Sequence, residues 1–367
     1  MYYLLMGHGI AEELNGEKKA PHLREELTHE EFLSSFNYYN LYASPNRTLP
    51  GKSLAFITPW NNKGYDYAKE FAKKFTHISP VWAQIKVDTE NRYLVQGLHD
   101  HDEAWILAVR TANPDINIVP RLLFDGWSGE NFDKLFKNPE NIKRLVDAFL
   151  PDYKRLEYDG IVLEIVSQHS GTSQRALIDF LKILSRYFRT NGMEFILVVP
   201  PPVYQGGYTG RMNKEIFDGL REHVDFFSVM TYDYSNQMMP GPNSPVNWIE
   251  ECVKRIVPSD EDTEGRSKLL VGINFYGNDF LPNLQSGGPI LASDFVKILQ
   301  THKPEFEWLL PAAEHLVRYT DNNGQPHTVY FPTPLSIARR ISLLHQLKVG
   351  VSVWELGQGF RSFLNYF

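Results

Sequence analysis

Eight short runs of apolar and β-branched residues recur along the chain and predict eight β-strands. Within each run the hydrophobic residues are continuous rather than alternating, which is typical of strands buried on both faces. The intervals carry amphipathic helical patterns, and the clearest of these span Gln174–Arg189 and Pro334–Leu347. The expected strands are Ser53–Trp60, His77–Lys86, Ile116–Leu123, Gly160–Val166, Phe195–Pro201, Phe226–Tyr232, Leu269–Phe275 and Gly350–Glu355.

The alternation of strands with helices indicates parallel pairing, and eight such units favour an α/β fold of the (β/α)8 TIM barrel type. A doubly wound open sheet is the competing fold. Against it, neither a G-x-G-x-x-G nor a G-x-x-x-x-G-K-S/T motif follows the first strand, where a nucleotide-binding sheet usually carries one.

Two segments fall outside the eight-strand pattern. Residues 1–50 show a helical pattern around Leu23–Ser34 and no strand, so they form either an N-terminal arm packed on the barrel or a partly disordered lead-in. Between the seventh and eighth strands, His315–Thr320 and His327–Pro332 flank an Asp-Asn-Asn-Gly hairpin turn signal. We therefore expect residues 51–367 to form the barrel, with a small α+β insertion between strands seven and eight at about residues 278–332.

The composition excludes several kinds of partner. The 367 residues are 43% hydrophobic and 22% charged with a net charge of −7, so there is no basic footprint for nucleic acid. No apolar run approaches the roughly 18 residues of a membrane span, and Met1–Met6 is too short for a signal-peptide core. The single cysteine, Cys252, rules out an internal disulfide. Neither His169 nor the other histidines show metal-ligand spacing, and we expect no metal or cofactor.

Function in a barrel of this kind sits at the C-terminal ends of the strands, and here those ends are rich in aromatic rings and carboxylates. Sugar rings offer apolar C–H faces and hydroxyl rims, which aromatic platforms edged by polar side chains can bind. This pattern suits a neutral sugar chain. The candidate ligand-binding residues are Trp60, Trp82, Trp127, Glu164, Met230, Tyr232, Asp233, Tyr276, Trp354 and Glu355.

The fourth expected strand, Tyr158 to Val166, resembles the active-site strand of glycoside hydrolase family 18. That family carries D-G-x-D-x-D-x-E, and aligning it on Asp159-Gly160 places Val162 and Glu164 on the second and third acidic positions. Val166 then falls on the final glutamate, which in the family is the proton donor. Since side chains alternate along a strand, we expect Glu164 and Val166 to share a face, with the Glu164 carboxylate one layer short of the catalytic position.

Two further motifs support the resemblance. Met230-Thr231-Tyr232-Asp233 is similar to the Met-x-Tyr-Asp of strand six in family 18, and Trp354 falls on the strand-eight tryptophan that floors the subsite beside the scissile bond. The resemblance implies that Tyr232 and Asp233 hold an N-acetyl group. It also implies substrate-assisted chemistry in active members, for which a glutamic acid must protonate the glycosidic oxygen. Valine cannot donate that proton.

Longer motifs resemble a chitinase-like subgroup of the family whose strand-four motif is degenerate in the same way. They are Ile57–Trp60, Ile78–Trp82, Val119–Phe124 and Val353–Gly359. This resemblance implies a secreted or lysosomal protein that binds chitooligosaccharides, and bacterial lipopolysaccharide as a further ligand. It also implies a scavenger-type receptor of the stabilin class as a partner. On the secretory path the sequon Asn46-Arg47-Thr48 would make Asn46 a glycosylation candidate.

Several candidate residues have a second interpretation. Packing is the better explanation for each of Trp60, Trp82 and Trp127. An ion pair with Arg121 in the barrel mouth explains Glu164 as well as contact with a ligand does, and bracing a loop explains Glu355 as well as lining the groove does. The sequence thus favours a saccharide-binding protein without hydrolase activity. One alternative is an active hydrolase whose proton donor has moved to Glu164, Asp233 or Glu355. A second is a receptor-interacting protein with a vestigial groove, for which residues 1–50 are the natural contact.

Overall fold

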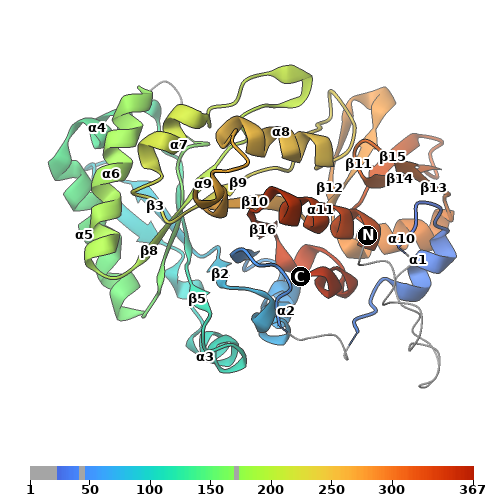
Figure 1. Ribbon diagram of the computed structural model, residues 1–367, viewed down its shortest axis with the longest axis horizontal. Coiled ribbons are helices and arrows are strands. Elements are labelled where there is room, and N and C mark those ends of the chain that lie inside the picture. The colour runs from blue at the N-terminus through green and yellow to red at the C-terminus, as the bar shows by residue number, and fades with distance from the viewer. Residues whose placement is uncertain (1–22, 41–45, 169–172) are drawn as a thin grey trace.

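The computed structural model describes residues 23–40, 46–168 and 173–367. Within these ranges the chain forms an eleven-stranded sheet and a separate five-stranded sheet, with helices around the larger one (Figure 1). The first 22 residues of the expected N-terminal arm and His169 lie outside the described residues.

The larger sheet is a closed barrel. Its strand order begins β4-β3-β6 and ends β1-β2-β5. Two barrel strands are each interrupted: β2 continues into β3, and β5 continues into β6. The pair β2-β5 at one end of the order is therefore the continuation of the pair β3-β6 at the other end, and the sheet closes. All the barrel pairings are parallel, whereas β4 (Tyr93–Gln96) adds an antiparallel hairpin to β3. The barrel strands are β1 (Ser53–Ile57), β2 (His77–Pro80) with β3 (Ala83–Val87), β5 (Asn117–Ile118) with β6 (Arg121–Phe124), β7 (Gly160–Glu164), β8 (Glu194–Val199), β9 (Phe226–Val229), β10 (Leu269–Asn274) and β16 (Gly350–Trp354).

Helices cover the outside of the barrel because their apolar faces match the outward-facing residues of the strands. Short polar residues fix several starting points: Asp102, Ser128 and Asn138 each accept a hydrogen bond from the first turn of the helix that follows. The barrel helices are α2 (Asn62–Glu70), α3 (Glu103–Ala112), α4 (Gly129–Lys137), α5 (Pro139–Arg155), α6 (Gln174–Thr190), α7 (Lys214–Leu220), α8 (Val246–Ile256), α9 (Thr263–Ser267) and α11 (Pro334–Leu347).

The expected (β/α)8 barrel with an α+β insertion between strands seven and eight is confirmed. Figure 1 shows the insertion in orange and red at the end of the molecule opposite α4, α5 and α6. The predicted hairpin pairs β14 with β15, and Gly324 in its turn has a φ of 78°. The insertion comprises β11 (Gly277–Leu281), β12 (Ser286–Ile290), α10 (Ala292–His302), β13 (Phe306–Leu309), β14 (Glu314–Thr320) and β15 (Pro326–Tyr330).

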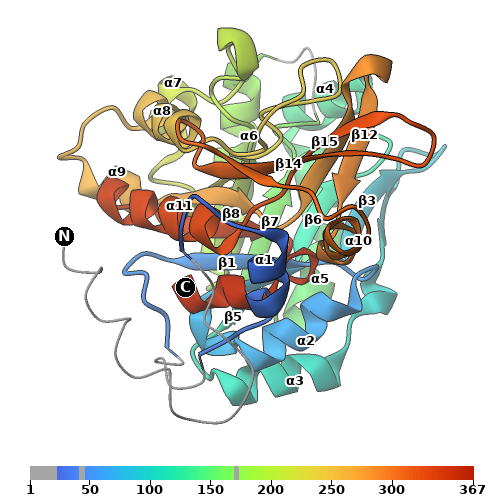
Figure 2. The same cartoon turned by 90° about the vertical axis from the view of Figure 1, so that its right-hand side faces the viewer.

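A short helix from the N-terminal segment, α1 (His29–Ser35), packs on the insertion, as Figure 2 shows for α1 and α10. Phe32 is 2% exposed, and its ring contacts those of Phe295, Phe306 and Phe360. The described part of residues 1–50 therefore lies against the insertion and the C-terminal segment. Among the described residues, no helix combines the length and the apolar character that crossing a membrane requires.

A buried ion pair joins the insertion to the barrel. The Arg340 guanidinium on α11 donates to Glu314 Oε2 at 2.7 Å and to the backbone oxygen of Ser244 at 2.9 Å, and both charged side chains are 0% exposed. Burial raises the pKa of Glu314, while the Arg340 charge and the backbone N–H groups of Asn243 and Ser244 oppose that rise. The pair fixes the start of β14, helix α11 and the loop before α8 relative to one another.

Removing only the cation of this pair should destabilise the protein strongly. We expect Arg340→Met to lower the free energy of unfolding by about 3–5 kcal/mol, because Glu314 is left buried without its counter-charge. Arg340→Met combined with Glu314→Leu should recover most of that loss. Urea denaturation at neutral pH measures both. In the exposed pair Arg255–Glu251, Arg255→Met serves as the matched control and should cost less than about 1 kcal/mol; an equal loss in both single variants would contradict the prediction.

Candidate functional site

The centre of the barrel mouth holds an ion pair between two adjacent strands. Arg121 on β6 donates from Nη1 to Glu164 Oε2 on β7 at 2.9 Å, and the two side chains are only 14% and 17% exposed. Ser167 Oγ donates to the other oxygen of Glu164 at 3.3 Å. The Glu164 carboxylate is therefore paired with a positive charge and held in place by its neighbours.

Trp354 ends β16 beside this ion pair. The Arg121 guanidinium lies 5.9 Å from the centroid of the indole, and the Phe56 ring at the end of β1 lies 5.2 Å from it. Trp354 and Met230 are half-buried and pack on the small hydrophobic cluster inside the barrel, which includes Val162. An aromatic ring thus stands at the barrel mouth, supported from within by apolar side chains.

Strand β9 leads into Tyr232 and Asp233 at the same end of the barrel. Tyr232 lies against β10, where a Cβ on Gly272 would come within 2.8 Å of its ring. Burial raises the pKa of Tyr232 well above its usual range, and the charges of Glu164 and Asp233 raise it further. Glu164 ends β7, and Tyr232 and Asp233 follow the end of β9, so all three lie at the C-terminal ends of barrel strands.

Asp233 is held in an unusual backbone conformation by a second set of contacts. Its φ is 58°, in the left-handed region, its N–H donates to Asn243 Oδ1 at 2.6 Å, and its Oδ1 accepts from Tyr276 Oη at 2.5 Å. Asp233 is exposed to solvent on one side. Partial desolvation of its carboxyl group raises the pKa of Asp233, and the hydrogen bond from Tyr276 lowers it. Tyr276 is itself 5% exposed. It therefore orients the Asp233 carboxylate and offers little surface of its own to a ligand.

Val166 does not share a face with Glu164. The strand ends at Glu164, so the alternation of side chains stops there, and Val166 lies in a turn. Val166 is fully buried in the same hydrophobic cluster as Ile161 and Leu163, the outward-facing residues of β7. The expectation of a shared face was wrong because it extended the strand by two residues.

Glu355 is buried below the surface of the barrel mouth. It is 0% exposed, and it accepts hydrogen bonds from Asn61 Nδ2 at 2.7 Å and from the N–H of Gly357 at 3.3 Å. Burial raises the pKa of Glu355 to about 7, against the lowering effect of these hydrogen bonds. A Cβ on Gly64 would stand 2.3 Å from Glu355 Oε1. The side chain braces the loop between β1 and α2.

Of the other three candidate tryptophans, two are packed against neighbouring side chains and one is exposed. Trp82 is 4% exposed and donates to Tyr65 Oη at 2.7 Å, and Trp127 stacks on Tyr93 and donates to the backbone oxygen of Ile85 at 2.9 Å. Trp60 is 70% exposed at the end of β1. The structure thus gives Trp82 and Trp127 packing roles and leaves Trp60 open to solvent.

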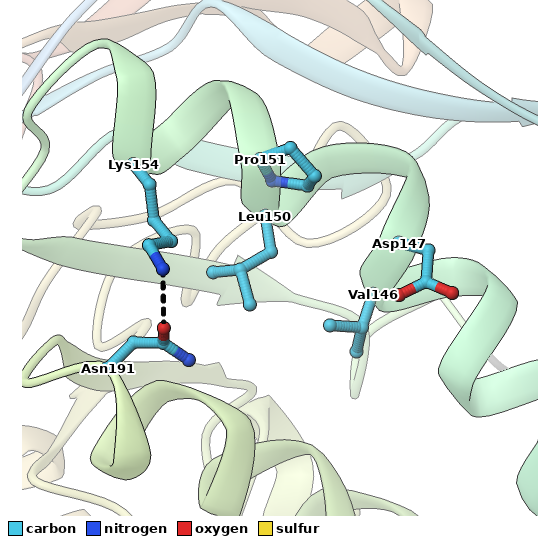
Figure 3. A pocket seen from close by; sticks show the side chains of 6 residues that line it. All are labelled: Val146, Asp147, Leu150, Pro151, Lys154 and Asn191. Atoms are coloured by element: carbon cyan, nitrogen blue, oxygen red, sulfur yellow. Dashed lines mark hydrogen bonds between the residues drawn. The ribbon is translucent and has the colours of Figure 1, made fainter.

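A surface cavity lies apart from the barrel mouth. A surface cavity of about 300 Å³ between α5 and the end of α6 is lined by Leu150 and Pro151 and crossed by a 2.9 Å hydrogen bond from Lys154 to Asn191 (Figure 3). It contains none of the barrel-mouth residues. Within the described ranges, no group of three His, Cys, Asp or Glu side chains is placed to hold a metal ion.

Sequence reasoning missed the residues that position the others. Asn243 holds the backbone of Asp233 from ten residues away, and Asn61 reaches Glu355 from the opposite end of the chain. Neither falls in a motif or a periodic pattern. The Gly-Pro-Asn sequence that carries Asn243 signals a turn, but it does not reveal which group the amide contacts.

Comparisons with known proteins agree with this architecture. A chitinase from Chromobacterium violaceum has a TM-score of 0.70 and 19% identity, over 86% of this chain and 96% of that one. The spore cortex-lytic enzyme SleL of Bacillus megaterium has a TM-score of 0.71 and 19% identity, over 88% and 74%. A Cycas revoluta chitinase in complex with (GlcNAc)4 has a TM-score of 0.69 and 15% identity, over 86% and 97%.

Two curated sequences from Bacillus subtilis also match. They are a sporulation-specific glycosylase, YdhD, at 20% identity and a cortical fragment-lytic enzyme at 24% identity, each over 66% of this chain. This chain spans 57% of the length of each of them. The family profile described as glycosyl hydrolases family 18 matches residues 52–359, and the chain belongs to that family.

Proposed function

We propose that this protein binds chitooligosaccharides or related N-acetylglucosamine glycans in the barrel mouth and does not hydrolyse them. The observation that carries the proposal is the loss of the catalytic glutamate from the strand-four motif. Val166 stands where the family has its proton donor, and the neighbouring carboxylate, Glu164, is tied to Arg121. Loss of a positioned general acid typically removes about 10²- to 10⁴-fold of rate.

The binding half of the proposal rests on groups that do not need that proton. Trp354 offers an aromatic ring, and Tyr232 and Asp233 offer polar groups at the same end of the barrel, which is the chemistry that a sugar ring and its N-acetyl group require. The (GlcNAc)4 complex of the Cycas revoluta chitinase supports the ligand class, since that protein shares the fold.

A narrower assignment within the family belongs to the same proposal. The motifs Ile57–Trp60, Ile78–Trp82, Val119–Phe124 and Val353–Gly359 are similar to those of chitinase domain-containing protein 1, the stabilin-interacting chitinase-like protein. We place this chain with that subgroup, and with it a secreted or lysosomal location and a receptor of the stabilin class as partner.

The relocated-acid alternative finds little support in the three carboxylates that it requires. Glu164 forms an ion pair with Arg121, and Asp233 accepts a hydrogen bond from Tyr276. Glu355 is fully buried and accepts a hydrogen bond from Asn61. The pKa of Glu355, about 7, would suit a general acid. Its burial, however, removes the carboxyl group from contact with a glycosidic oxygen.

Trp354→Ala should weaken the binding of chitotetraose about tenfold or more, because stacking there contributes about 1.4 kcal/mol. For the unmodified protein we expect a dissociation constant between about 1 μM and 1 mM, which is a free energy of about −8 to −4 kcal/mol. Isothermal titration calorimetry measures both. Trp127→Phe, which changes an indole packed on Tyr93, is the matched control and should bind as the unmodified protein does. An unchanged constant in Trp354→Ala would remove this residue from the site.

The unmodified protein should release no product from chitotetraose above the uncatalysed rate in a chromatographic turnover assay. Glu164→Gln should leave that result unchanged. Clear hydrolysis that Glu164→Gln abolishes would instead establish a relocated acid. We expect Val166→Glu to lower stability by several kcal/mol without restoring turnover, since the new carboxyl group would be buried among apolar side chains.

Glu355→Gln should reveal the burial of this carboxyl group through the pH dependence of stability. The pKa of Glu355 rises from 4.5 to about 7 on folding, so the folded state holds this proton more tightly than the unfolded state does. The contribution of Glu355 is therefore most favourable below pH 4.5 and is lost as the pH rises to about 7. Relative to Glu355→Gln, the unmodified protein should lose about 3 kcal/mol across that window in urea denaturation. A pH-independent difference would contradict the burial argument.

A further inference from the structure

A buried histidine of the insertion holds the arm, which we define as residues 23–40. His315, near the start of β14, is 1% exposed. Its Nε2 lies 2.9 Å from the backbone oxygen of Glu25, and its Nδ1 lies 2.8 Å from Thr333 Oγ1. Because a carbonyl oxygen can only accept, Nε2 carries a proton and donates it to Glu25. The Thr333 hydroxyl can donate to Nδ1, so a neutral ring satisfies both contacts.

Aromatic rings complete the surroundings of His315. The centroids of the Trp308 and Phe306 rings lie 4.6 Å and 5.5 Å from that of the imidazole. Burial lowers the pKa of His315 from 6.5 to about 4, and the hydrogen bond to the backbone of Glu25 opposes this shift. The ring is therefore neutral at neutral pH while the arm is bound.

The charged groups on the elements packed around His315 have other partners or are exposed to solvent. The paired groups are Arg24 with Glu31 and His29 with Glu30 on the arm, Glu307 with Arg318, His327 with Asp279, and Glu314 with Arg340. The exposed groups are Glu25, Glu26, Glu305 and Arg339. Within residues 23–40, 46–168 and 173–367, no carboxylate contacts the imidazole ring. A second proton on His315 would thus be buried without a counter-charge.

The end of the arm is held by groups of another kind. The N–H of Asn40 donates to Asn365 Oδ1 at 2.9 Å, and Asn365 Nδ2 donates to the backbone oxygen of Tyr38 at 3.0 Å. The Tyr39 ring lies 4.8 Å from the Phe71 ring. Amides and these rings do not change charge between pH 4 and pH 7. Acid therefore acts on the first part of the arm, where His315 holds it, and not on residues 38–40.

We propose that the contact between His315 and Glu25 is a pH-sensitive latch, which releases residues 23–36 from the insertion when the solution becomes acidic. Protonation makes the buried ring costly, and movement of Glu25 away from it lets water reach the charge. Release uncovers the rings of Phe295 and Phe306, which Phe32 contacts in the bound arm. The latch shares no residue with the barrel-mouth group and does not depend on the proposed function.

The direction of the pH response follows from the pKa of His315. This pKa is lower with the arm bound than with the ring open to water, so the released state binds more protons. Binding of the arm is therefore most favourable above pH 6.5, weakens as the pH falls, and has lost the whole contribution below about pH 4. Between pH 7 and pH 5 the equilibrium constant for release should rise about twentyfold.

Hydrogen exchange of the whole chain at pH 7, 6 and 5 tests the latch, with rates corrected for the intrinsic pH dependence of amide exchange. The protection of residues 24–36 should fall about twentyfold across this range, and that of residues 38–40 should not change. This window lies above the range in which carboxyl groups ordinarily take up protons. A fall of less than about threefold in residues 24–36 would overturn the proposal.

Two glutamine variants assign the response to one residue. His315→Gln keeps an N–H donor for Glu25 but cannot take up a proton, so the pH response of residues 24–36 should disappear. His29→Gln, on α1 itself, is the matched control and should keep the full response. A response that survives in His315→Gln, or that disappears in His29→Gln, would overturn the assignment to His315.

NMR of the unmodified protein with 15N-labelled histidine gives a measurement that needs no variant to fold. At pH 7 His315 should show a proton on Nε2 and none on Nδ1. As the pH falls, the Nδ1 proton should appear together with the loss of protection in residues 24–36. A doubly protonated His315 at pH 6 with the arm still fully protected would overturn the latch.

Discussion

The buried pair of Arg340 and Glu314 is the contact on which the geometry of the barrel mouth depends. Arg340 donates to the carbonyl of Ser244, and the backbone N–H groups of Asn243 and Ser244 lower the pKa of Glu314, so both charged side chains act on the same short segment. The side chain of Asn243 in turn holds the N–H of Asp233. The charge pair between the insertion and helix α11 therefore holds the segment whose Asn243 positions Asp233 at the candidate site.

This dependence explains how a residue can keep a left-handed backbone without being glycine. A φ of 58° at Asp233 costs free energy, and such a conformation persists only where surrounding contacts impose it. The amide of Asn243 binds the backbone of Asp233 and the hydroxyl of Tyr276 binds its side chain. Through Glu314 the insertion thus contributes to the structure that holds the site.

The barrel could be predicted from the sequence because it rests on local patterns, whereas the contacts that build the site could not. Continuous apolar runs mark strands such as β7 and β10, and an Asp-Asn-Asn-Gly turn marks the hairpin of β14 and β15. Strand β7 ends at Glu164, two residues before the predicted end, and no turn residue or change in hydrophobic pattern signals that end in the sequence. The partners of Glu355 and Asp233 lie 294 and 10 positions away, and only the closed barrel brings Asn61 to Glu355.

The contact between Gly64 and Glu355 has a consequence for how sequences of this kind can change. Helix α2 passes so close to the Glu355 carboxylate that position 64 has no room for a methyl group while that carboxylate stays where it is. The size of the side chain at position 64 is thereby linked to that at position 355, although the two positions are 291 residues apart in the chain. A relative with alanine or a larger residue at the first should carry a shorter side chain at the second, and a paired substitution of this kind would appear in an alignment as covariation.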